Sequence, residues 1–449
     1  MNPATSTIWM NVTTSAGWTG APMGVVRVER CLEDRLAALF GERFKRCVWR
    51  DGDFEEWTAP PRAPGGPSDC SAQGEAWLVP LLPRRQALVA LGQALLSLAP
   101  AALRPAINRG LQLCRPKNAT HVVEDATRGF VSPALGNLFQ PGDVLLTVGL
   151  DWDHPFPAVL DRLRRERSVR VVTCCYDLIP VLYPQYCAED MVGLFTRHFL
   201  NLARGSDLVL CISRQSERDF LGFVADHGVS APRTCVFPLG DNVPDGGSGA
   251  VSPRVRALCG EPFILFVSTI ERRKNHEVLY RAYHLLCAEG RGAGLPKLVF
   301  VGMAGWGVQD FLKDVELDPL TRHLVVVLNH VNDAELAALY RHAQFCVFPS
   351  FYEGWGLPVG EALAMGKAVL SSDRGSLVEA GGEFARYVDP WNPRAWAEAI
   401  HNLATDPDSL SRLEEAVRAG YKPRRWDDAA LAVKSAIEAL PPVDGAKAP

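Results

Sequence analysis

Short runs of consecutive apolar residues alternate along the first half of the chain with stretches of helical periodicity. The clearest runs are DVLLTVGL (143–150), VRVVTCCYDLI (169–179) and DLVLCIS (207–213). A helical stretch from Val25 to Phe40 places Val28, Leu32, Leu36 and Leu39 on one face. Continuous apolar strands that alternate with helices are typical of a parallel sheet covered on both faces. This half is therefore predicted to be a Rossmann-like α/β domain.

A second series of strands follows the Gly- and Ser-rich segment 241–252. Its apolar runs are PFILFVS (262–268), KLVFVG (297–302), LVVVL (324–328), FCVFPS (345–350) and AVLSS (368–372), with helices predicted between them over His276–Ala288 and Asp333–His342. This pattern predicts a second Rossmann-like domain.

The predicted boundaries follow from these two series. We expect a first domain over residues 1–250, with a Pro-, Gly- and Ser-rich insertion at about 58–120, and a second domain over residues 251–425. A last helix within residues 426–449, over roughly Asp427 to Leu440, either crosses back to the first domain or stays with the second. The fold class is therefore α/β with two parallel sheets, and the place of the last helix stays open.

The composition narrows the class of protein. The chain has 449 residues, 47% of them hydrophobic, and a net charge of −4. This argues against a dedicated nucleic-acid binder, which would carry a basic face and a high pI. The 12 cysteines include no Cys-X-X-Cys pair, so neither a zinc site nor a disulfide framework is indicated. Since no signal peptide follows Met1, we expect reduced thiols in a cytoplasmic protein.

One apolar segment, residues 87–103, bears on membrane contact. It is 17 residues long and contains Gln, Ser, Gly and Pro, whereas a membrane span needs about 20 mostly apolar residues. The residues that flank it are basic: Arg84, Arg85, Arg104, Arg109, Arg115 and Lys117. Two interpretations remain open, a helix that lies on an anionic membrane surface and a core helix of the first domain.

The segment 349–372, PSFYEGWGLPVGEALAMGKAVLSS, carries the strongest chemical signal. It begins where a buried strand ends, at the carboxyl edge where open α/β sheets bind their ligands. Glu353 precedes a Gly-rich turn, and the helix entered through Leu357 carries Glu361. Glycines let the backbone approach a ligand, the helix start offers free N–H groups, and each carboxylate could hold a pair of sugar hydroxyls. The alternative is a strand-to-helix connection that contains two glutamates by chance.

This segment resembles the signature of the retaining nucleotide-sugar glycosyltransferases of the GT-B fold, family 4. In that family a strand ending Pro-Ser is followed by Glu-Gly-aromatic-Gly-Leu-Pro and then by Glu-Ala. The resemblance continues through FVSTIERRKNHEVLYRAYHLL (266–286), HVNDAELAALYRHAQFCVFPS (330–350) and GSLVEAGGEFARYVDP (375–390). It implies two Rossmann-like domains that face each other across a cleft, and transfer of a sugar from a nucleotide donor with retention of anomeric configuration.

The resemblance also implies roles for residues of the second domain. Lys274, with Arg273, is expected at the diphosphate of the donor, where fixed cations stabilise the departing nucleotide. Glu361 is expected to bind the ribose hydroxyls, and Glu353 is expected near the transferred sugar. Further donor contacts are expected from Gly354, Trp355, Gly356, Leu357, Thr269 and, at the base, Val331.

The first domain resembles the family less closely. Residues 20–36, GAPMGVVRVERCLEDRL, resemble the loop-to-helix segment in which Gly24 would approach the donor phosphates. Residues 206–220, SDLVLCISRQSERDF, resemble a strand that ends in serine before a helix, which makes Ser213 and Arg214 candidate cleft residues.

Residues 172–184, VTCCYDLIPVLYP, resemble a segment usually written His-Asp-Leu-X-Pro. Tyr176 takes the place of the histidine, and Asp177 is retained. In relatives this histidine lies beside the anomeric carbon, and Tyr176 can still donate a hydrogen bond there. Asp177 either serves the site or caps the turn that follows it.

Two Asp-X-Asp triplets match the pattern by which another large glycosyltransferase fold holds a divalent cation. They are Asp51-Gly52-Asp53 and Asp151-Trp152-Asp153. Neither has the sequence context of that fold, and Lys274 can supply charge at the diphosphate, so we expect no metal requirement. Asp151 and Trp152 are interpreted as part of a loop on the acceptor side.

The sequence leaves several classes of substrate and function open. The segment 177–180 looks most like bacterial mannosyltransferases of polysaccharide assembly, which favours GDP-mannose over a UDP- or dTDP-sugar. The expected acceptor is a saccharide, lipid-linked at the inner membrane surface, which agrees with a peripheral membrane contact through residues 84–117. Retention is expected through front-face attack rather than a covalent intermediate. The remaining alternatives are a nonhydrolysing nucleotide-sugar epimerase and a catalytically inactive sugar-binding or scaffold protein.

Overall fold

The computed structural model describes residues 6–18, 24–58, 136–187, 191–241, 243 and 249–441. The chain divides into two units, residues 1–68 with 135–449, and residues 69–134. The second unit, and with it most of the predicted insertion and the basic-flanked apolar segment, lies outside the described residues. The first unit contains both predicted series of strands.

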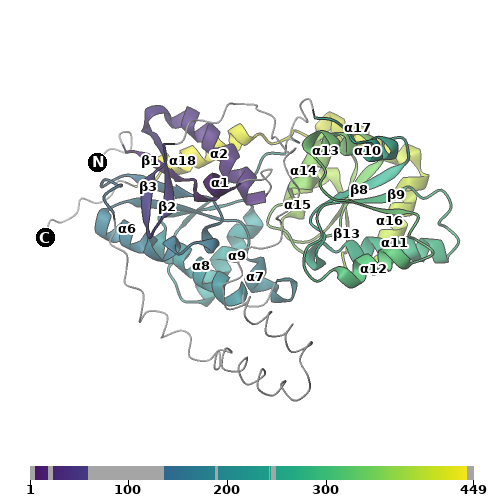
Figure 1. Cartoon of the computed structure of the whole chain (residues 1–449), viewed down its shortest axis with the longest axis horizontal. Helices are drawn as coiled ribbons and strands as arrows, with labels where there is room; N and C mark the ends of the chain where they lie inside the picture. Colours follow the sequence, from purple (N-terminus) through teal and green to yellow (C-terminus); the bar gives the residue numbers. More distant parts are fainter. Residues whose placement is uncertain are drawn as a thin grey trace, which may run out of the picture. The chain divides into compact units, whose positions relative to one another are not determined.

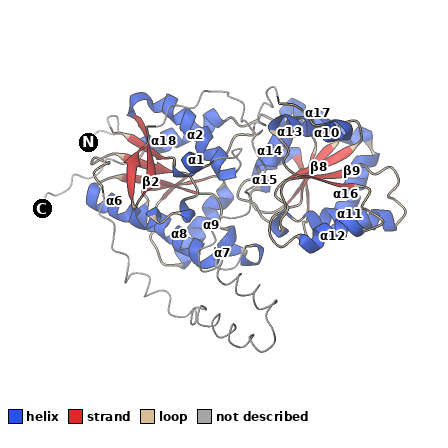
Figure 2. Cartoon of the chain, in the orientation of Figure 1, coloured by secondary structure: helices blue, strands red, loops and turns tan. Residues whose placement is uncertain are grey.

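The first series forms a sheet of seven strands in the order β3-β2-β1-β4-β5-β6-β7. Strands are red and helices blue in Figure 2. The strands are β1 (Ile8–Asn11), β2 (Phe44–Arg50), β3 (Asp53–Glu56), β4 (Val144–Thr147), β5 (Arg170–Cys175), β6 (Leu208–Cys211) and β7 (Arg233–Val236). All neighbours pair in parallel except β2 and β3, which form an antiparallel hairpin. β1 lies between β2 and β4, with Ile8 opposite both Phe44 and Val144.

The second series forms a sheet of six strands in the order β10-β9-β8-β11-β12-β13. The strands are β8 (Phe263–Val267), β9 (Lys297–Val301), β10 (Val325–Leu328), β11 (Phe345–Phe348), β12 (Val369–Ser372) and β13 (Ala385–Val388). Every neighbouring pair is parallel. The predicted α/β class with two largely parallel sheets is confirmed.

Helices connect the strands and cover the sheets (Figure 1). In the first half they are α1 (Thr13–Gly17), α2 (Gly24–Phe40), α6 (Leu160–Arg167), α7 (Ile179–Leu182), α8 (Met191–Gly205) and α9 (Arg214–Asp226). The second half has α10 (Pro253–Leu258), α11 (His276–Ala288), α12 (Gln309–Leu317), α13 (Asp333–His342), α14 (Leu357–Ala364), α15 (Leu377–Gly381), α16 (Pro393–Thr405), α17 (Pro407–Gly420) and α18 (Trp426–Glu438). Within the described residues no helix is long and apolar enough to cross a membrane.

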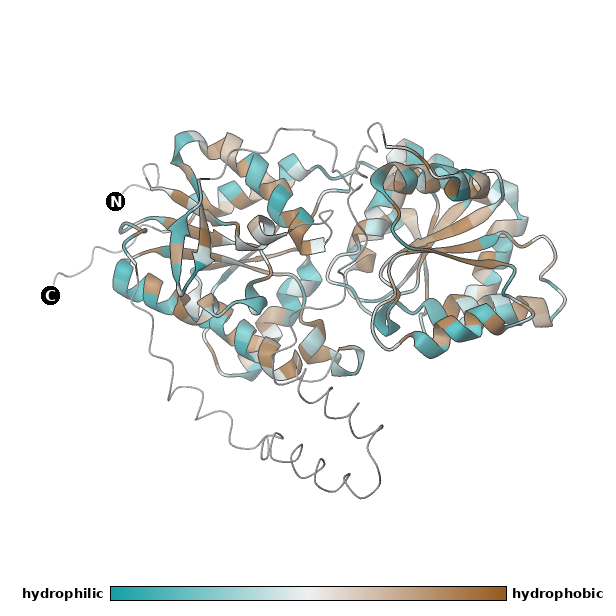
Figure 3. Ribbon diagram, viewed as in Figure 1, coloured by the Kyte–Doolittle hydropathy of each residue, from teal (hydrophilic) through white to brown (hydrophobic). Residues whose placement is uncertain are grey.

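Alternation along the strands explains why both faces of the first sheet are covered. Ile8 and Met10 of β1 belong to a core cluster with Leu32 of α2, whereas Trp9 packs in a separate cluster with Leu163 of α6. Successive residues of a strand point to opposite faces, so a strand that is apolar throughout requires helices on both sides. Figure 3 shows the apolar strands inside and the polar surfaces of the helices outside.

The hairpin between β2 and β3 accounts for one of the two Asp-X-Asp triplets. Asp51 and Gly52 both have positive φ, 52° and 93°, and they form the two-residue turn between Arg50 and Asp53, which pair across the hairpin. Asp-Gly is the dipeptide that this kind of turn favours. Asp53 accepts a hydrogen bond from the backbone N–H of Phe54 at 2.8 Å.

The last helix packs against the first half of the chain. α18 lies beside α2 (Figure 1), and Arg35 of α2 donates a hydrogen bond to Asp427 at 2.7 Å. The segments that lead into and out of the second half are also joined, because the buried Asp241 carboxylate accepts hydrogen bonds from the Tyr421 hydroxyl at 2.6 Å and the Arg424 backbone N–H at 2.9 Å. The Asp241 carboxylate therefore joins the two segments through which the chain passes between its first and second halves.

Candidate functional site

An ion cluster forms at the carboxyl edge of the second sheet, where Glu353 follows β11. One oxygen of the buried Glu353 carboxylate accepts a hydrogen bond from Lys274 Nζ at 2.6 Å, and the other from Arg273 Nη1 at 2.7 Å. Arg273 also donates to Glu271 at 2.7 Å. The 3-10 turn Arg272–Lys274 follows the end of β8 at Val267 in the chain. The fold therefore brings together three residues that the sequence had placed in two separate motifs.

The cations determine the charge of Glu353. Burial alone would raise the pKa of this carboxyl, but Arg273 and Lys274 lower it to about 2. Glu353 is therefore ionised at neutral pH. Arg273 is likewise held in its charged form, because the attraction of Glu353 and Glu271 outweighs its burial and raises its pKa.

Asn275 fixes the turn that carries the two cations. Its φ is 60°, and its buried side-chain amide donates to the carbonyls of Pro349 at 3.1 Å and Pro390 at 2.8 Å. These carbonyls follow β11 and β13, so one amide joins three loops at the same edge of the sheet. The backbone N–H of Phe351 also donates to the Arg273 carbonyl at 2.9 Å.

Gly354 lies against the first half of the chain. A Cβ at this position would be 2.5 Å from the Tyr176 carbonyl oxygen and 3.0 Å from Asp177 Cβ. Ser216 of α9 donates to that carbonyl at 2.7 Å and lies 3.3 Å from the Gly354 carbonyl. The contact explains why glycine is needed at 354: the turn packs on backbone of the first half.

Gly356 and α14 position the second glutamate of the signature. Gly356 has a φ of 101°, a backbone conformation that requires glycine, and a Cβ there would also displace Leu377 Cδ2, 2.6 Å away. α14 begins at the next residue and buries Glu361. One Glu361 oxygen accepts from Arg27 Nη1 at 2.6 Å, and the other from the Tyr340 hydroxyl at 2.9 Å.

Arg27 thus connects α2 of the first half to the signature helix of the second. Burial by itself lowers the pKa of Arg27, but the Glu361 carboxylate raises it above the ordinary value. Neither Arg27 nor Tyr340 was predicted from the sequence, although Arg27 lies in the segment 20–36 that places Gly24 at the donor. The available signal was an arginine one helical turn after Gly24, in a loop-to-helix segment already attributed to the donor.

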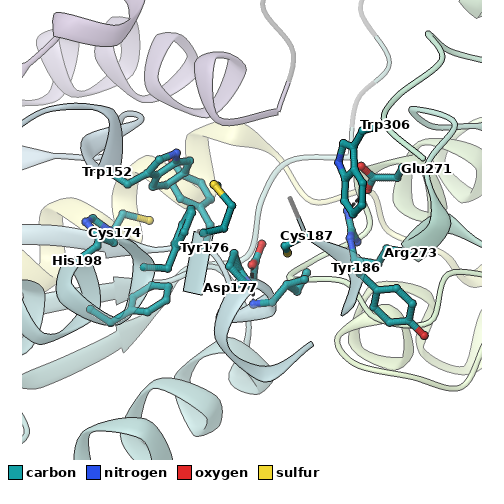
Figure 4. Close-up of a pocket in the computed structure, with 15 residues that line it drawn as sticks. Trp152, Cys174, Tyr176, Asp177, Tyr186, Cys187, His198, Glu271, Arg273 and Trp306 are labelled. Carbon is teal, nitrogen blue, oxygen red and sulfur yellow. Dashed lines mark hydrogen bonds and ion pairs between the residues drawn. The ribbon is translucent and has the colours of Figure 1, made fainter. Parts of the chain in front are cut away.

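A cavity of about 420 Å³ lies beside the ion cluster. Its lining residues from the first half include Trp152, Tyr176, Asp177 and His198, and those from the second half are Glu271, Arg273 and Trp306. In Figure 4, Trp152, Cys174 and His198 lie at one end of the pocket and Glu271, Arg273 and Trp306 at the other. The cavity is therefore aromatic at one end and charged at the other, within the size range of small-molecule pockets, about 300–1,000 Å³.

The two residues of the altered His-Asp motif take different positions at this cavity. The hydroxyl of the buried Tyr176 donates to the carbonyl of Val148, the residue that follows β4. Asp177 accepts from the Ile179 backbone N–H at 3.0 Å and so caps the turn into α7. Burial raises the pKa of Asp177, although Arg273 opposes that shift. Asp177 therefore combines the predicted capping contact with a place in the cavity lining.

The other candidate residues are spread around the site. Ser213 is buried and caps α9, accepting from the Ser216 backbone N–H at 2.9 Å. Trp355 is buried beneath the Arg424 guanidinium, 4.9 Å from the ring centroid. The rest lie at element boundaries: Gly24 and Leu357 as the first residues of α2 and α14, Thr269 exposed after β8, and Val331 half-buried between β10 and α13. Their donor contacts remain predictions.

The second Asp-X-Asp triplet does not converge on one point. Asp151 is buried and accepts from Thr147 Oγ1 at 2.6 Å, whereas Asp153 is exposed. Burial, and then the nearby Glu29, raise the pKa of Asp151 to about 8. In the described part of the chain no group of three or more His, Cys, Asp or Glu side chains could hold a metal ion.

Comparison with known proteins bears on both halves of the chain. Residues 254–420 match the family model described as glycosyl transferases group 1. The serotype-specific mannosyltransferase WbdA of Escherichia coli is 28% identical over 275 residues, which are 59% of this chain and 33% of WbdA. The O-antigen chain mannosyltransferase B of Escherichia coli is 30% identical over 228 residues, which are 50% of this chain and 58% of that relative. The chain thus spans about a third of the first relative and somewhat over half of the second.

Among solved structures, that of HepE from Anabaena in complex with UDP covers 97% of this chain and all of HepE, with a TM-score of 0.58 and 14% identity. At this identity the likeness concerns the fold alone, and it extends over both sheets. The chain therefore has the GT-B fold, and its residues 254–420 are similar to the glycosyl transferases group 1 family, with bacterial O-antigen mannosyltransferases among the relatives.

Proposed function

We propose that this chain is a retaining glycosyltransferase that transfers a mannosyl group from GDP-mannose to a saccharide acceptor during assembly of a cell-surface polysaccharide. The observation that carries the proposal is the ion cluster of Glu353, Arg273 and Lys274, whose Arg273 lines the cavity. The names of the curated relatives, mannosyltransferases of O-antigen chains, support mannose as the transferred sugar.

The chemistry of transfer assigns work to these side chains. The bond between the anomeric carbon and the β-phosphate oxygen breaks, and a bond forms from that carbon to an acceptor hydroxyl oxygen on the same face. The hydroxyl proton passes to the departing phosphate, so the front-face route needs no protein nucleophile. Negative charge gathers on that phosphate, and Lys274 and Arg273 stabilise it. We assign this role to side chains alone, so turnover is expected to withstand EDTA.

The contacts of Lys274 and Glu361 suit the two ends of such a donor. Within the described chain Glu353 is the sole hydrogen-bond acceptor of Lys274 Nζ, which leaves two of its three N–H groups for phosphate oxygens. Glu361 binds the ribose hydroxyls in this proposal. Since Arg27 and Tyr340 occupy both of its oxygens, ribose binding exchanges at least one of these partners for a hydroxyl group.

The acceptor in this proposal is a lipid-linked saccharide, and the protein acts at the cytoplasmic face of the inner membrane. Mannosyltransferases of O-antigen chains are the relatives that support a saccharide acceptor. Sedimentation with vesicles of anionic phospholipid tests the membrane contact. Binding that persists when Arg84, Arg85, Arg104 and Arg109 are replaced by glutamine would contradict the assignment of residues 84–117 to this contact.

The second candidate is a transferase of the same fold that uses a UDP- or dTDP-sugar. The solved structure of HepE contains UDP, and this observation is the reason to test uridine nucleotides as donors as well. A catalytically inactive sugar-binding protein is the non-enzymatic candidate, motivated by Tyr176, whose hydroxyl is engaged by the Val148 carbonyl.

A thermal-shift screen with GDP, UDP, dTDP and their sugars separates these candidates. A ligand present at 100 times its Kd stabilises the folded state by about 2.7 kcal/mol. We expect a shift with GDP and GDP-mannose that Lys274→Ala and Glu361→Ala both abolish. Lys313→Ala and Glu316→Ala, at exposed positions of α12, are matched controls that retain it.

The outcomes discriminate between donors and between functions. A shift with uridine or thymidine nucleotides alone would replace the proposed donor, and no shift with any nucleotide would favour the inactive protein. Anomeric proton signals of the product then test retention, since an inverted linkage would contradict the front-face route.

A further inference from the structure

A row of five aromatic rings runs from the cavity to the surface: Tyr183, Tyr186, Phe351, Tyr352 and Trp391. Tyr186 and Phe351 stack with centroids 5.3 Å apart and planes 3° from parallel. Phe351 and Trp391 follow at 4.1 Å. Tyr183 joins the row to Tyr352 at 4.7 Å and to Tyr186 at 6.2 Å. Because Tyr186 also lines the cavity, the row is continuous with the candidate site.

The backbone fixes the position of this row. Phe351 follows β11 and Trp391 follows β13, so both lie at the carboxyl edge of the second sheet. Asn275 binds the carbonyls of Pro349 and Pro390, which come two residues before Phe351 and directly before Trp391. The Asn275 amide therefore holds the two loops together. Because Lys274 directly precedes Asn275, the same contacts fix the stacked rings relative to Lys274.

Exposure increases along the row. Tyr186 is 7% exposed, whereas Trp391 is 65% exposed and is the most exposed large apolar side chain of the described residues. Burial of an indole ring is favourable. The Trp391 ring nevertheless stays largely in water, although its neighbours in the row are packed. Contiguous apolar surface of this kind is typical of ligand-binding grooves, and the Trp391 ring ends a row of stacked rings that begins at the cavity.

We propose that this aromatic row, with Trp391 at its outer end, binds sugar units of the acceptor beyond the unit that receives the transferred sugar. The inference rests on the proposed function and adds to it the substrate class, a saccharide of several units rather than a single sugar. A pyranose ring has a patch of C–H groups that packs on a flat aromatic face, and rigid tryptophan and tyrosine rings supply such faces at small entropic cost.

The polar surroundings of Trp391 favour a saccharide over a bilayer. Asp389 accepts from the Trp391 backbone N–H at 3.2 Å, and Arg374 donates to the same carboxylate oxygen at 3.2 Å. These charges lie at the backbone of Trp391, next to the exposed ring in the chain, and a carboxylate and a guanidinium can bind sugar hydroxyls. A carboxylate is costly to place in a hydrocarbon phase.

The experiment compares mannose with α-linked mannotetraose on the full-length protein, with no donor present. Calorimetry gives the Kd of each for the wild type, Trp391→Ala and Trp391→Phe, with Leu317→Ala as a control at a 58% exposed position of α12. We expect Trp391→Ala to raise the Kd of mannotetraose about fivefold to tenfold and to leave that of mannose unchanged. Trp391→Phe retains most of the affinity, and Leu317→Ala retains all of it.

The results separate failure of this inference from failure of the proposed function. Equal mannotetraose affinity in the wild type and Trp391→Ala overturns the inference even if mannosyl transfer occurs. If transfer is absent while Trp391→Ala still loses mannotetraose binding, the aromatic row is a saccharide site and it is the catalytic proposal that fails. If Trp391→Ala reduces retention on anionic phospholipid vesicles and leaves saccharide affinity intact, the row is a membrane contact and the inference is wrong.

Discussion

At the residue scale, the carboxyl groups near the site differ in charge because their neighbours differ. Glu353 is held between Arg273 and Lys274, and its pKa falls to about 2. Asp151 has a threonine hydroxyl and no cation as its partner in the described contacts, and burial raises its pKa to about 8. Glu353 is therefore ionised at pH 7, because two cations stabilise its charge, whereas Asp151 is a neutral acid at that pH.

Glu353→Gln removes the shared counter-charge of two cations. A fall in pKa from 4.5 to about 2 corresponds to roughly 3 kcal/mol, so the variant is expected to lose about that much free energy of unfolding at pH 7. Since the folded-state pKa is depressed, this contribution is present above pH 4.5 and disappears as the pH falls towards 2. Urea denaturation between pH 7 and pH 3 measures the difference.

The exposed Glu316→Gln variant on α12 is the matched control for Glu353→Gln and should follow the wild type at every pH. A wild-type advantage over Glu353→Gln that stays constant down to pH 3 would contradict the charge assignment.

For Asp151→Asn the difference in stability from the wild type is expected to grow as the pH rises, whereas for Glu353→Gln it shrinks as the pH falls. Because the folded-state pKa is raised from 3.8 to about 8, the folded protein binds the extra proton, and the wild type loses stability as the pH rises through this range. The variant cannot ionise, so it should gain about 2 to 4 kcal/mol over the wild type between pH 5 and pH 8. Thermal unfolding at both pH values tests this, with Asp34→Asn, on the exposed side of α2, as control. A constant difference would rule out burial as the cause.

At the element scale, strands with long apolar runs were predictable and short or amphipathic ones were not. The helices over His276–Ala288 and Asp333–His342 match the prediction to the residue, because helical periodicity was strong and, in the second, Asn332 and Glu335 form a capping box. β2, β3, β7 and β13 were missed. β7 is half exposed and β3 is the second strand of an antiparallel hairpin, so neither has the continuous apolar run of a buried parallel strand.

The candidate site was predictable to the extent that its residues lie in sequence motifs. Glu353, Glu361, Arg273 and Lys274 were selected in this way, and the structure brings all but Glu361 into one cluster. The partners of Glu361 come from elements far apart in sequence, Arg27 being 334 positions away. No local periodicity carries such information, since only the packing of the halves creates the contact.

Gly356→Ala tests how the start of α14 positions Glu361. The substitution places a Cβ at a φ of 101° and 2.6 Å from Leu377 Cδ2, so we expect a loss of about 2 to 4 kcal/mol in stability and weaker nucleotide binding. Chemical denaturation and the thermal-shift screen measure the two effects. Gly222→Ala, within α9 and with nothing near the added Cβ, should be neutral or stabilising by up to about 1 kcal/mol. Equal effects of the two substitutions would refute the assigned strain.

At the scale of the whole molecule, the last helix stabilises the first half of the chain. Trp426 begins α18, is 2% exposed, and its indole leaves no room for a Cβ at Gly240, 2.6 Å away. Trp426→Ala is expected to cost about 3 to 5 kcal/mol and to act on the first sheet. Hydrogen exchange should accelerate in α2 and β1 and remain unchanged in α11.

Leu431→Ala, at a 46% exposed position of the same helix, should leave the exchange rates of both halves as they are. Acceleration in α11 equal to that in α2 after Trp426→Ala would mean that α18 supports the second half as much as the first.

The pairing of α2 with α18 also sets an order of events during biosynthesis. About 400 residues separate the starts of these helices, and ribosomes add roughly 5 to 20 residues per second. The side of α2 that α18 covers therefore stays open on the nascent chain for about 20 to 80 seconds, long enough for a chaperone to bind it. A product that terminates before Trp426 keeps that surface open permanently, which marks it as incomplete for cellular quality control.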